Sequence, residues 1–409
     1  MTPVDRKQGV VLSSGGADGA YAVGVLKALL NGHSPATDYV PIQPGVFVGS
    51  SIGALNGALV VSEFENGIQA ATDYLERIWL EEMAESSQLC GNGTYRIRLD
   101  PLRLLDPRCF AQSPVKTVAS FAEDSQSLVE DWLARAKDFA TSSEALERRA
   151  IRLLNLGSFI SSEPLLKLIQ RTIRFEKIRR SKTALKIMAT NWTKGGLDEF
   201  SNADLTDEIG PQIIKASAAM PGFFPPVKIG DDIYVDAAVL GYTKLAPAID
   251  AGADVLHVIY VDPDVADVPL GALESTMDTL YRMFVIGWGD NVEVSIKAVA
   301  RINGHVDVIE QTAREAKLSK SLAKILIKDL LPPGRFIVGP DEEILGLRKV
   351  TVHRYHPDNN LFGPLGLLNL ERQRLEGLIA RGFDDAVAHD CTGSGCVLPR
   401  STEQVQAAA

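Results

Sequence analysis

The sequence predicts an α/β protein in which a central, mostly parallel sheet is sandwiched by helices and carries a helical insertion. Short strand-like runs alternate with segments of helical periodicity along the chain. The run VLHVIYV at residues 255–261 is nearly all apolar, which is typical of a strand covered on both faces. In addition, two glycine-rich turns, centred near residues 15 and 51, each follow a strand and open a helix.

The order of the elements follows from the spacing of apolar residues and from turn residues. Strand patterns occupy residues 10–12, 46–48, 184–190, 233–235, 255–261 and 335–353. Helical patterns occupy residues 20–32, 54–60, 62–83, 165–175, 212–219, 273–303, 311–331 and 369–389. Gly32 ends the first helix, and Gly195-Gly196 predicts a hairpin after the strand at 184–190.

We expect one domain over residues 1–389, with its core at about 8–84 and 160–262. A helical insertion is expected at about 85–159, because residues 125–154 are charged and helical in pattern. A helical extension follows over 263–389. The tail at 390–409 is small and polar, so it is predicted to be disordered.

Composition excludes several classes of protein. The chain has 409 residues, is 45% hydrophobic and carries a formal net charge of −10, which argues against nucleic-acid binding and against general attraction to anionic bilayers. It has no run of eighteen apolar residues, so no transmembrane helix is expected. The start, MTPVDRKQGVVL, lacks the apolar centre of a signal peptide. We therefore expect a cytoplasmic protein, with peripheral contact to a membrane left open.

The cysteine content does not predict a disulfide scaffold or a zinc site. The four cysteines are Cys90, Cys109, Cys391 and Cys396, and they lack a paired C-x-x-C pattern. Ordinary thiols in a reducing compartment are expected, although Cys391 and Cys396 are close enough in sequence to bridge if oxidised.

The segment VGSSIGALNGAL at residues 48–59 predicts a strand, a tight turn and a helix, with Ser51 at the centre of G-x-S-x-G. In a nucleophile elbow the glycines, here Gly49 and Gly53, let strand and helix pass closely while the serine is held exposed. The helix N-terminus beneath it favours developing negative charge. The alternative is an ordinary turn in which the serine caps the helix.

The loop SGGADG at residues 14–19 allows three interpretations. Its backbone N–H groups could cradle a phosphate, although Ser14 replaces the first glycine of G-x-G-x-x-G. The same groups could form an oxyanion hole, which requires donors without side-chain bulk. The third is a plain turn.

Ser51 needs a base to act as a nucleophile. Among the six histidines, His353 and His356 are the candidates for a triad, because they lie in the polar stretch TVHRYHPDNN. The other candidate is Asp236, which ends an apolar strand and could act directly in a Ser–Asp dyad. An aspartate at a strand end can also be a simple turn former.

These segments together resemble the patatin-like phospholipase family over most of residues 8–262. LSSGGADGAYAVGVLKAL is similar to that family's oxyanion loop and first helix, and VGSSIGALNGAL to its nucleophile elbow. KASAAMPGFFPPVKIGDDIYVDAAV is similar to the segment that leads to its catalytic aspartate, and GADVLHVIYVD to the strand that follows. The resemblance implies the patatin variant of the α/β hydrolase fold, with Ser51 as nucleophile and Asp236 as base. It implies an oxyanion hole at Gly15, Gly16 and Ala17, and no catalytic histidine, metal or cofactor.

Three positions differ from the family pattern. Asp18 stands where the family has arginine, Ser14 where it has a first glycine, and Ala237 where it has the glycine after the aspartate. Asp18 would place a negative charge near the oxyanion site. Ala237 would be strained if its backbone required a positive φ.

The resemblance implies a serine lipid acyl hydrolase of the phospholipase A, lysophospholipase or esterase type, acting on phospholipid or lysophospholipid. The differing positions leave two alternatives: an attenuated protein that binds lipid or a partner without turnover, and a nucleotide-binding protein that uses SGGADG. Residues 314–331, REAKLSKSLAKILIKDLL, predict a cationic amphipathic helix. Such a helix either lies in a membrane interface or packs its apolar stripe on the core.

Overall fold

The computed structural model describes residues 6–86, 91–97, 160–240, 244–261, 276–317, 349–358, 361 and 364–399, with residues 126, 129 and 133. Within these ranges eight strands form one sheet in the order β10-β9-β1-β2-β5-β8-β7, and β6 also pairs with β5. The strands are β1 (Gln8–Leu12), β2 (Pro44–Ser50), β5 (Ala184–Asn191), β6 (Gly196–Phe200), β7 (Val227–Ile229), β8 (Asp232–Val235), β9 (Val255–Ile259) and β10 (Thr351–Tyr355).

The sheet is mixed and mostly parallel, as the sequence predicted. Strands β10, β9, β1, β2 and β5 run parallel to one another. Strands β6, β7 and β8 add an antiparallel corner beyond β5. Leu12, at the end of β1, is in register with Gly49 of β2, so the turns that follow these two strands open on the same edge of the sheet.

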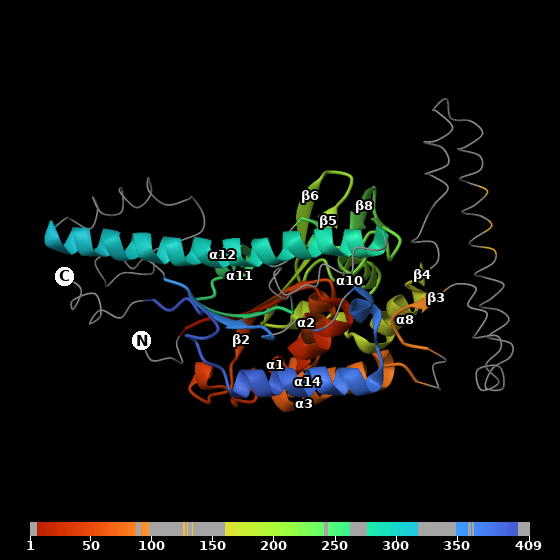
Figure 1. Ribbon diagram of the computed structural model, residues 1–409, viewed down its shortest axis with the longest axis horizontal. Helices are drawn as coiled ribbons and strands as arrows, with labels where there is room; N and C mark the ends of the chain where they lie inside the picture. Colours follow the sequence, from red (N-terminus) through yellow and green to blue (C-terminus); the bar gives the residue numbers. More distant parts are fainter. Residues whose placement is uncertain are drawn as a thin grey trace, which may run out of the picture.

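Helices cover both faces of the sheet, which explains why its central strands are apolar on both sides. Along β1, Val10 and Leu12 face one cluster of buried residues while Val11 faces another. The first cluster includes α1, α2, α3 and α14, and the second includes α12. Figure 1 shows α1, α3 and α14 together on one side, with α11 and the long α12 on the other.

The helix bounds are as follows: α1 (Ala20–Leu30), α2 (Ile52–Glu63), α3 (Ile68–Arg77), α8 (Glu163–Thr172), α9 (Phe175–Arg180), α10 (Gly210–Ser217), α11 (Ala246–Asp250), α12 (Thr276–Glu315) and α14 (Arg372–Val387). Short helical turns lie at η2 (Gly16–Gly19), η3 (Pro35–Thr37), η4 (Phe64–Asn66), η7 (Ala237–Val239) and η10 (Pro364–Leu368), and η5 (Ile78–Met83) is π-helical. Among the described residues no helix is both long and apolar enough to cross a membrane.

The C-terminal half differs from the sequence prediction in two places. The two helices expected at 273–303 and 311–331 are replaced, as far as residue 315, by the single helix α12. Lys317 lies beyond its end with φ 50°, so it does not continue the helical face expected over 314–331. Residues 318–331, which carry the rest of that predicted helix, lie outside the described residues.

The second difference from the prediction concerns the tail, which was expected to be disordered. Its residues 390–399 are folded. Val352 and Val397 exchange two backbone hydrogen bonds of 2.8 and 2.9 Å, so the tail pairs with β10 at the end of the sheet. The polar composition suggested disorder, but an open strand edge supplies partners that composition does not reveal. Most of the predicted insertion at 85–159 lies outside the described residues. Within its first part, β3 (Arg96–Ile97) pairs with β4 (Ile160–Ser161), which directly follows the insertion.

Candidate active site

Ser51 lies at the turn between β2 and α2, where the sequence placed it. Its backbone has φ 54° and ψ −124°, a conformation that non-glycine residues rarely adopt. Strained backbone of this kind occurs often at functional sites. Close packing of strand and helix enforces the turn. A Cβ on Gly49 would lie 2.5 Å from the carbonyl oxygen of Gly53, and one on Gly53 would lie 2.5 Å from that of Leu12. Gly49 therefore lets the start of α2 pass close to β2, and Gly53 lets it pass close to the end of β1.

A second serine, which sequence reasoning missed, holds this turn in place. The backbone N–H of Ser51 donates to Ser217 Oγ at 2.9 Å. The Ser217 hydroxyl in turn donates to the carbonyl oxygen of Met188 in β5 at 2.6 Å. Ser217 ends α10 and is fully buried. The sole signal for it in the sequence is a polar residue within the apolar stretch IIKASAAM.

The predicted oxyanion loop lies beside this turn. Gly15 has φ 151° and Gly16 has φ 54°, so the backbone takes a course that favours glycine. A Cβ on Gly16 would also lie 2.4 Å from the carbonyl oxygen of Leu367. The buried side chain of Asn56 in α2 donates to the carbonyl oxygen of Gly19 at 3.1 Å and accepts from Trp79 Nε1 at 2.8 Å. Asn56, also missed from the sequence, thus fixes η2 against α2.

The negative charge of Asp18 has a partner from the far end of the chain. Its carboxylate forms a buried ion pair with Arg374 in the first turn of α14. Burial raises the pKa of Asp18 to about 6, and the Arg374 guanidinium opposes that rise. The sequence placed this charge near the oxyanion loop, and the structure adds the cation that balances it. Because the two residues are 356 positions apart, only the docking of α14 brings them together.

Asp236 follows β8, and hydrogen bonds hold both its backbone and its carboxylate. Its N–H donates to the carbonyl oxygen of Ala219 at 3.0 Å, and its own carbonyl accepts from Thr190 Oγ1 at 2.9 Å. Oδ1 accepts from the backbone N–H of Ala238 at 2.8 Å. Ala237 is not among the residues with positive φ, so the strain anticipated for an alanine there does not occur.

Burial makes the carboxyl of Asp236 easy to protonate. The residue is 1% exposed, and this desolvation raises its pKa to about 7. Hydrogen bonding to Ala238 and the hydroxyls of Ser51 and Ser14 act in the opposite direction. The second oxygen, Oδ2, makes no well-aligned hydrogen bond within the described part of the chain. A buried oxygen of this kind is suited to accept a proton.

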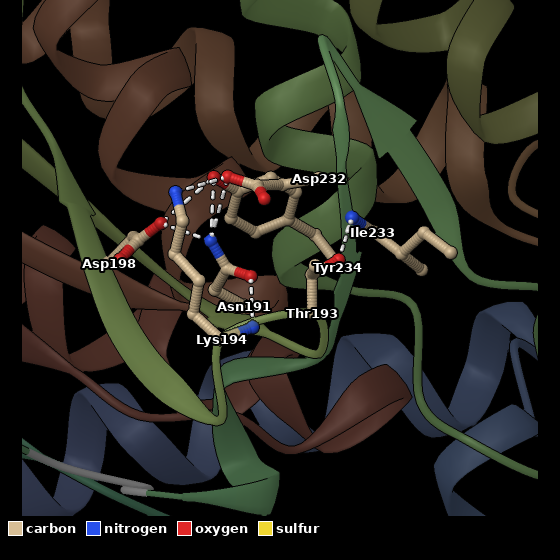
Figure 2. Close-up of polar contacts among 7 residues, drawn as sticks. All are labelled: Asn191, Thr193, Lys194, Asp198, Asp232, Ile233 and Tyr234. Atoms are coloured by element: carbon tan, nitrogen blue, oxygen red, sulfur yellow. Dashed lines mark hydrogen bonds and ion pairs between the residues drawn. The ribbon is translucent and has the colours of Figure 1, made fainter.

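A polar network at the antiparallel corner positions β8, and with it Asp236. Figure 2 shows Asn191 Nδ2 between the carboxylates of Asp198 and Asp232, at 2.8 and 3.1 Å. The hydroxyl of Tyr234 donates to Asp198 at 2.8 Å, and Lys194 pairs with Asp232 at 2.6 Å. These bonds join β5, β6 and β8 just before the chain reaches Asp236.

Ser51 and Asp236 border one cavity whose walls are mainly apolar. It encloses about 750 Å³, part of it open to solvent, and its lining comes from both halves of the chain. The lining residues are Gly16, Ala17, Ser51, Ile52, Leu55, Met83, Thr94, Tyr95, Leu165, Ile214, Ala218, Met220, Phe223, Phe224, Asp236, Leu367, Leu368 and Leu370. An apolar pocket with a few convergent polar groups is the usual form of a small-molecule site.

The two histidines considered for a triad lie elsewhere. His353 is in the middle of β10, where its ring stacks on His257 at 5.3 Å between centroids. The ring of His356 stacks on Tyr260 at 4.9 Å. No histidine is among the described residues that line the cavity. The geometry therefore brings Ser51 together with Asp236, and not with His353 or His356.

Comparisons with known proteins assign the chain to a family. A search of curated proteins finds no significant match. Among solved structures, VipD from Legionella pneumophila is similar at 15% identity and a TM-score of 0.34, over 94% of this chain and 66% of that one. This chain thus spans slightly less than two thirds of VipD's length. The family model described as patatin-like phospholipase matches residues 10–249, which include Gly15, Ser51 and Asp236. The chain belongs to the patatin-like phospholipase family.

Proposed function

We propose that this protein is a serine lipid acyl hydrolase of the phospholipase A, lysophospholipase or esterase type, with Ser51 as nucleophile and Asp236 as its base. The observation that carries the proposal is that a serine on a strained turn and a buried carboxyl border one apolar cavity. The apolar walls suit the acyl chain of a phospholipid or lysophospholipid. The charged head of such a lipid would stay at the open side.

In the proposed first step, the carboxylate of Asp236 takes the hydroxyl proton of Ser51 while Ser51 Oγ attacks the ester carbonyl. The oxyanion that forms would accept hydrogen bonds from backbone N–H groups of Gly15, Gly16 and Ala17. The ester C–O bond then breaks, and Asp236 returns the proton to the leaving alcohol. In the second step, Asp236 takes a proton from water as that water attacks the acyl-Ser51. Collapse of this adduct breaks the Ser51 Oγ–acyl bond and releases the fatty acid, and Asp236 returns its proton to Ser51.

The direct test is covalent labelling with a fluorophosphonate probe together with hydrolysis of a lysophospholipid and a soluble short-chain ester. Wild type should be labelled and active, whereas Ser51→Ala should lose both properties and keep its melting temperature. Ser50→Ala is the matched control, because Ser50 is the adjacent buried serine at the end of β2 and should retain labelling. Equal labelling of the Ser51→Ala variant would contradict the proposed nucleophile. Lipid binding without labelling or turnover in wild type would favour a binding protein instead.

A further inference from the structure

The edge of the sheet beyond β10 holds two histidines and two cysteines that the proposed function does not use. His353 comes from β10, His389 follows α14, and Cys391 and Cys396 come from the folded tail. One ligand atom from each residue lies within 4.8 Å of all the others. Both histidines are buried and both cysteines are half-buried.

The spacing of these atoms matches a tetrahedral metal site. Cys391 Sγ is 3.4 Å from His353 Nδ1 and 3.6 Å from His389 Nε2, and Cys396 Sγ is 3.4 Å from His389 Nε2. Zinc bonds of about 2.3 Å to sulfur and about 2.0–2.1 Å to nitrogen, at tetrahedral angles, place sulfur and nitrogen about 3.6 Å apart. Three of the six atom pairs are thus within about 0.2 Å of the separation in a zinc site, and the other pairs lie within 4.8 Å.

Hydrogen bonds hold the loop that carries Cys391 and Cys396 in a turn that brings both sulfur atoms toward the histidines. The N–H of Cys396 donates to the carbonyl oxygen of Cys391 at 2.9 Å, which closes the C-x₄-C turn. The carboxylate of Asp390 accepts from the N–H groups of Thr392 and Gly393 at 3.0 and 2.9 Å. The backbone N–H of Arg354 points at Cys396 Sγ at 3.4 Å, an interaction that stabilises a thiolate.

We propose that His353, His389, Cys391 and Cys396 bind one Zn²⁺ ion in a structural site. Both thiols would lose their protons to solvent on binding, and both imidazoles would bind as neutral ligands. Two thiolates balance the charge of the ion, which suits a largely buried position. Four protein ligands leave no open coordination position, so the ion would have no part in the acyl transfer.

The ion would join two ends of a segment that contributes to the candidate active site. Residues 354–388 lie between His353 and His389, and this segment supplies Leu367, Leu368 and Leu370 to the cavity wall. It also supplies Arg374, the partner of Asp18. A metal at this point would close that segment into a loop and restrict its unfolding.

The first experiment uses the full chain, without a histidine tag, purified under reducing conditions. We expect about one zinc per chain by elemental mass spectrometry. Replacement with Co²⁺ should give the visible bands of tetrahedral cobalt and sulfur-to-cobalt charge transfer in the near ultraviolet. Removing the metal with a chelator should lower the melting temperature, and adding Zn²⁺ should restore it. Wild-type protein that holds no zinc and gives no charge-transfer band on adding Co²⁺ would overturn the proposal.

Variants assign the ligands. Cys391→Ser and Cys396→Ser should each lose zinc and the charge-transfer band, and His353→Asn should lose zinc. The matched controls are Cys90→Ser with Cys109→Ser and, separately, His356→Asn; all should keep one zinc per chain. Zinc retained in both Cys391→Ser and Cys396→Ser would place the metal elsewhere and refute the site. A Cys391–Cys396 disulfide that persists in reduced protein would refute it as well. None of these readouts depends on hydrolase activity, so they remain informative even if the proposed function fails.

Discussion

At the scale of single residues, Asp236 combines burial with a backbone held by two hydrogen bonds and a carboxylate held by a third. Its pKa of about 7 follows chiefly from desolvation, which penalises the charged form. A general base works best when its pKa is near the operating pH, because it must be ionised and yet bind a proton well. The site thus gives a carboxylate a pKa suited to a role that many serine hydrolases assign to histidine.

The pH dependence of hydrolysis tests this residue. Because the base must be ionised, kcat/KM for a soluble ester should rise with pH through about 7 and level off above it. Asp236→Asn should lower turnover by roughly 10²–10⁴-fold. His356→Ala is the control and should keep both rate and profile. A profile with its midpoint near pH 4, the ordinary value for aspartate, would contradict the role of burial.

The raised pKa of Asp236 also makes the stability of the protein depend on pH. Most aspartates have a lowered pKa in the folded protein and stabilise it as pH rises, whereas Asp236 should do the opposite. Folded Asp236 binds a proton below pH about 7, whereas the unfolded chain releases it near 3.8. The folded state therefore holds more protons between these values, and the free energy of unfolding should fall as pH rises through this window. Asp236→Asn should weaken that fall in urea unfolding measured between pH 4 and 8.

At the scale of elements, helix α14 supports the candidate site from near the end of the chain, whereas the oxyanion loop, Ser51 and Asp236 come from earlier segments. Arg374 in its first turn neutralises Asp18 beside the oxyanion loop, and Asp385 in its last turn accepts from the hydroxyl of Tyr21 in α1 at 2.9 Å. Two polar anchors at opposite ends thus fix how α14 lies on α1. The family match ends at residue 249, so this helix is a contribution of the following segment.

Removing one partner of the Asp18–Arg374 pair should be costly, because the other charge then stays buried and unpaired. We expect Arg374→Ala to lower the free energy of unfolding by about 3–5 kcal/mol, and Asp18→Asn combined with Arg374→Ala to recover part of that loss. Arg372→Ala is the matched control on the same helix. Its exposed pair with Glu376 should be worth less than about 1 kcal/mol.

The free energies of unfolding of the single and double variants are measured by urea unfolding. Equal losses of unfolding free energy in Arg374→Ala and Arg372→Ala would show that the buried ion pair stabilises the protein no more than the exposed one. Asp18→Arg, which would restore the family's residue, should now destabilise the protein, since two guanidinium groups would face each other in a buried place.

At the scale of the whole molecule, the net charge of −10 opposes approach to an anionic lipid surface. A local cationic segment would have to overcome this repulsion. The described part of the chain ends at Lys317 in this region, while Lys320, Lys324 and Lys328 lie outside it. Membrane contact through residues 314–331 therefore stays a prediction.

Vesicle binding tests it. If the segment contacts lipid, binding should rise with the fraction of anionic lipid and weaken with salt. Changing Lys317, Lys320, Lys324 and Lys328 to glutamate should abolish binding and leave hydrolysis of a soluble ester unchanged. The control changes four lysines outside residues 314–331, Lys167, Lys182, Lys228 and Lys297, to glutamate. Equal loss of binding in the control would assign the effect to net charge and contradict a specific contact.

The sequence by itself determined the α/β class and the positions of the two glycine turns. These follow from local physics: apolar runs form strands, helical spacing forms helices, and glycines mark the turns between them. The parallel pairing of β1 and β2 then brings the two turns to one edge. The G-x-S-x-G turn made Ser51 a candidate, but the choice of Asp236 over His353 and His356 needed the resemblance, because an aspartate at a strand end has no distinctive local pattern.

The tertiary structure alone decided the pairings across long stretches of chain. Ser217 reaches Ser51 over 166 residues and Arg374 reaches Asp18 over 356, and no local periodicity encodes either contact. The Cys–His cluster was missed for the same reason: H-x-C-x₄-C in the tail lacks a ligand until β10 supplies His353. The folding of residues 390–399 also depends on a tertiary contact, the pairing of Val397 with the open edge of β10. Packing brings distant side chains together, and in doing so it sets their charge and burial, which the linear order of residues does not contain.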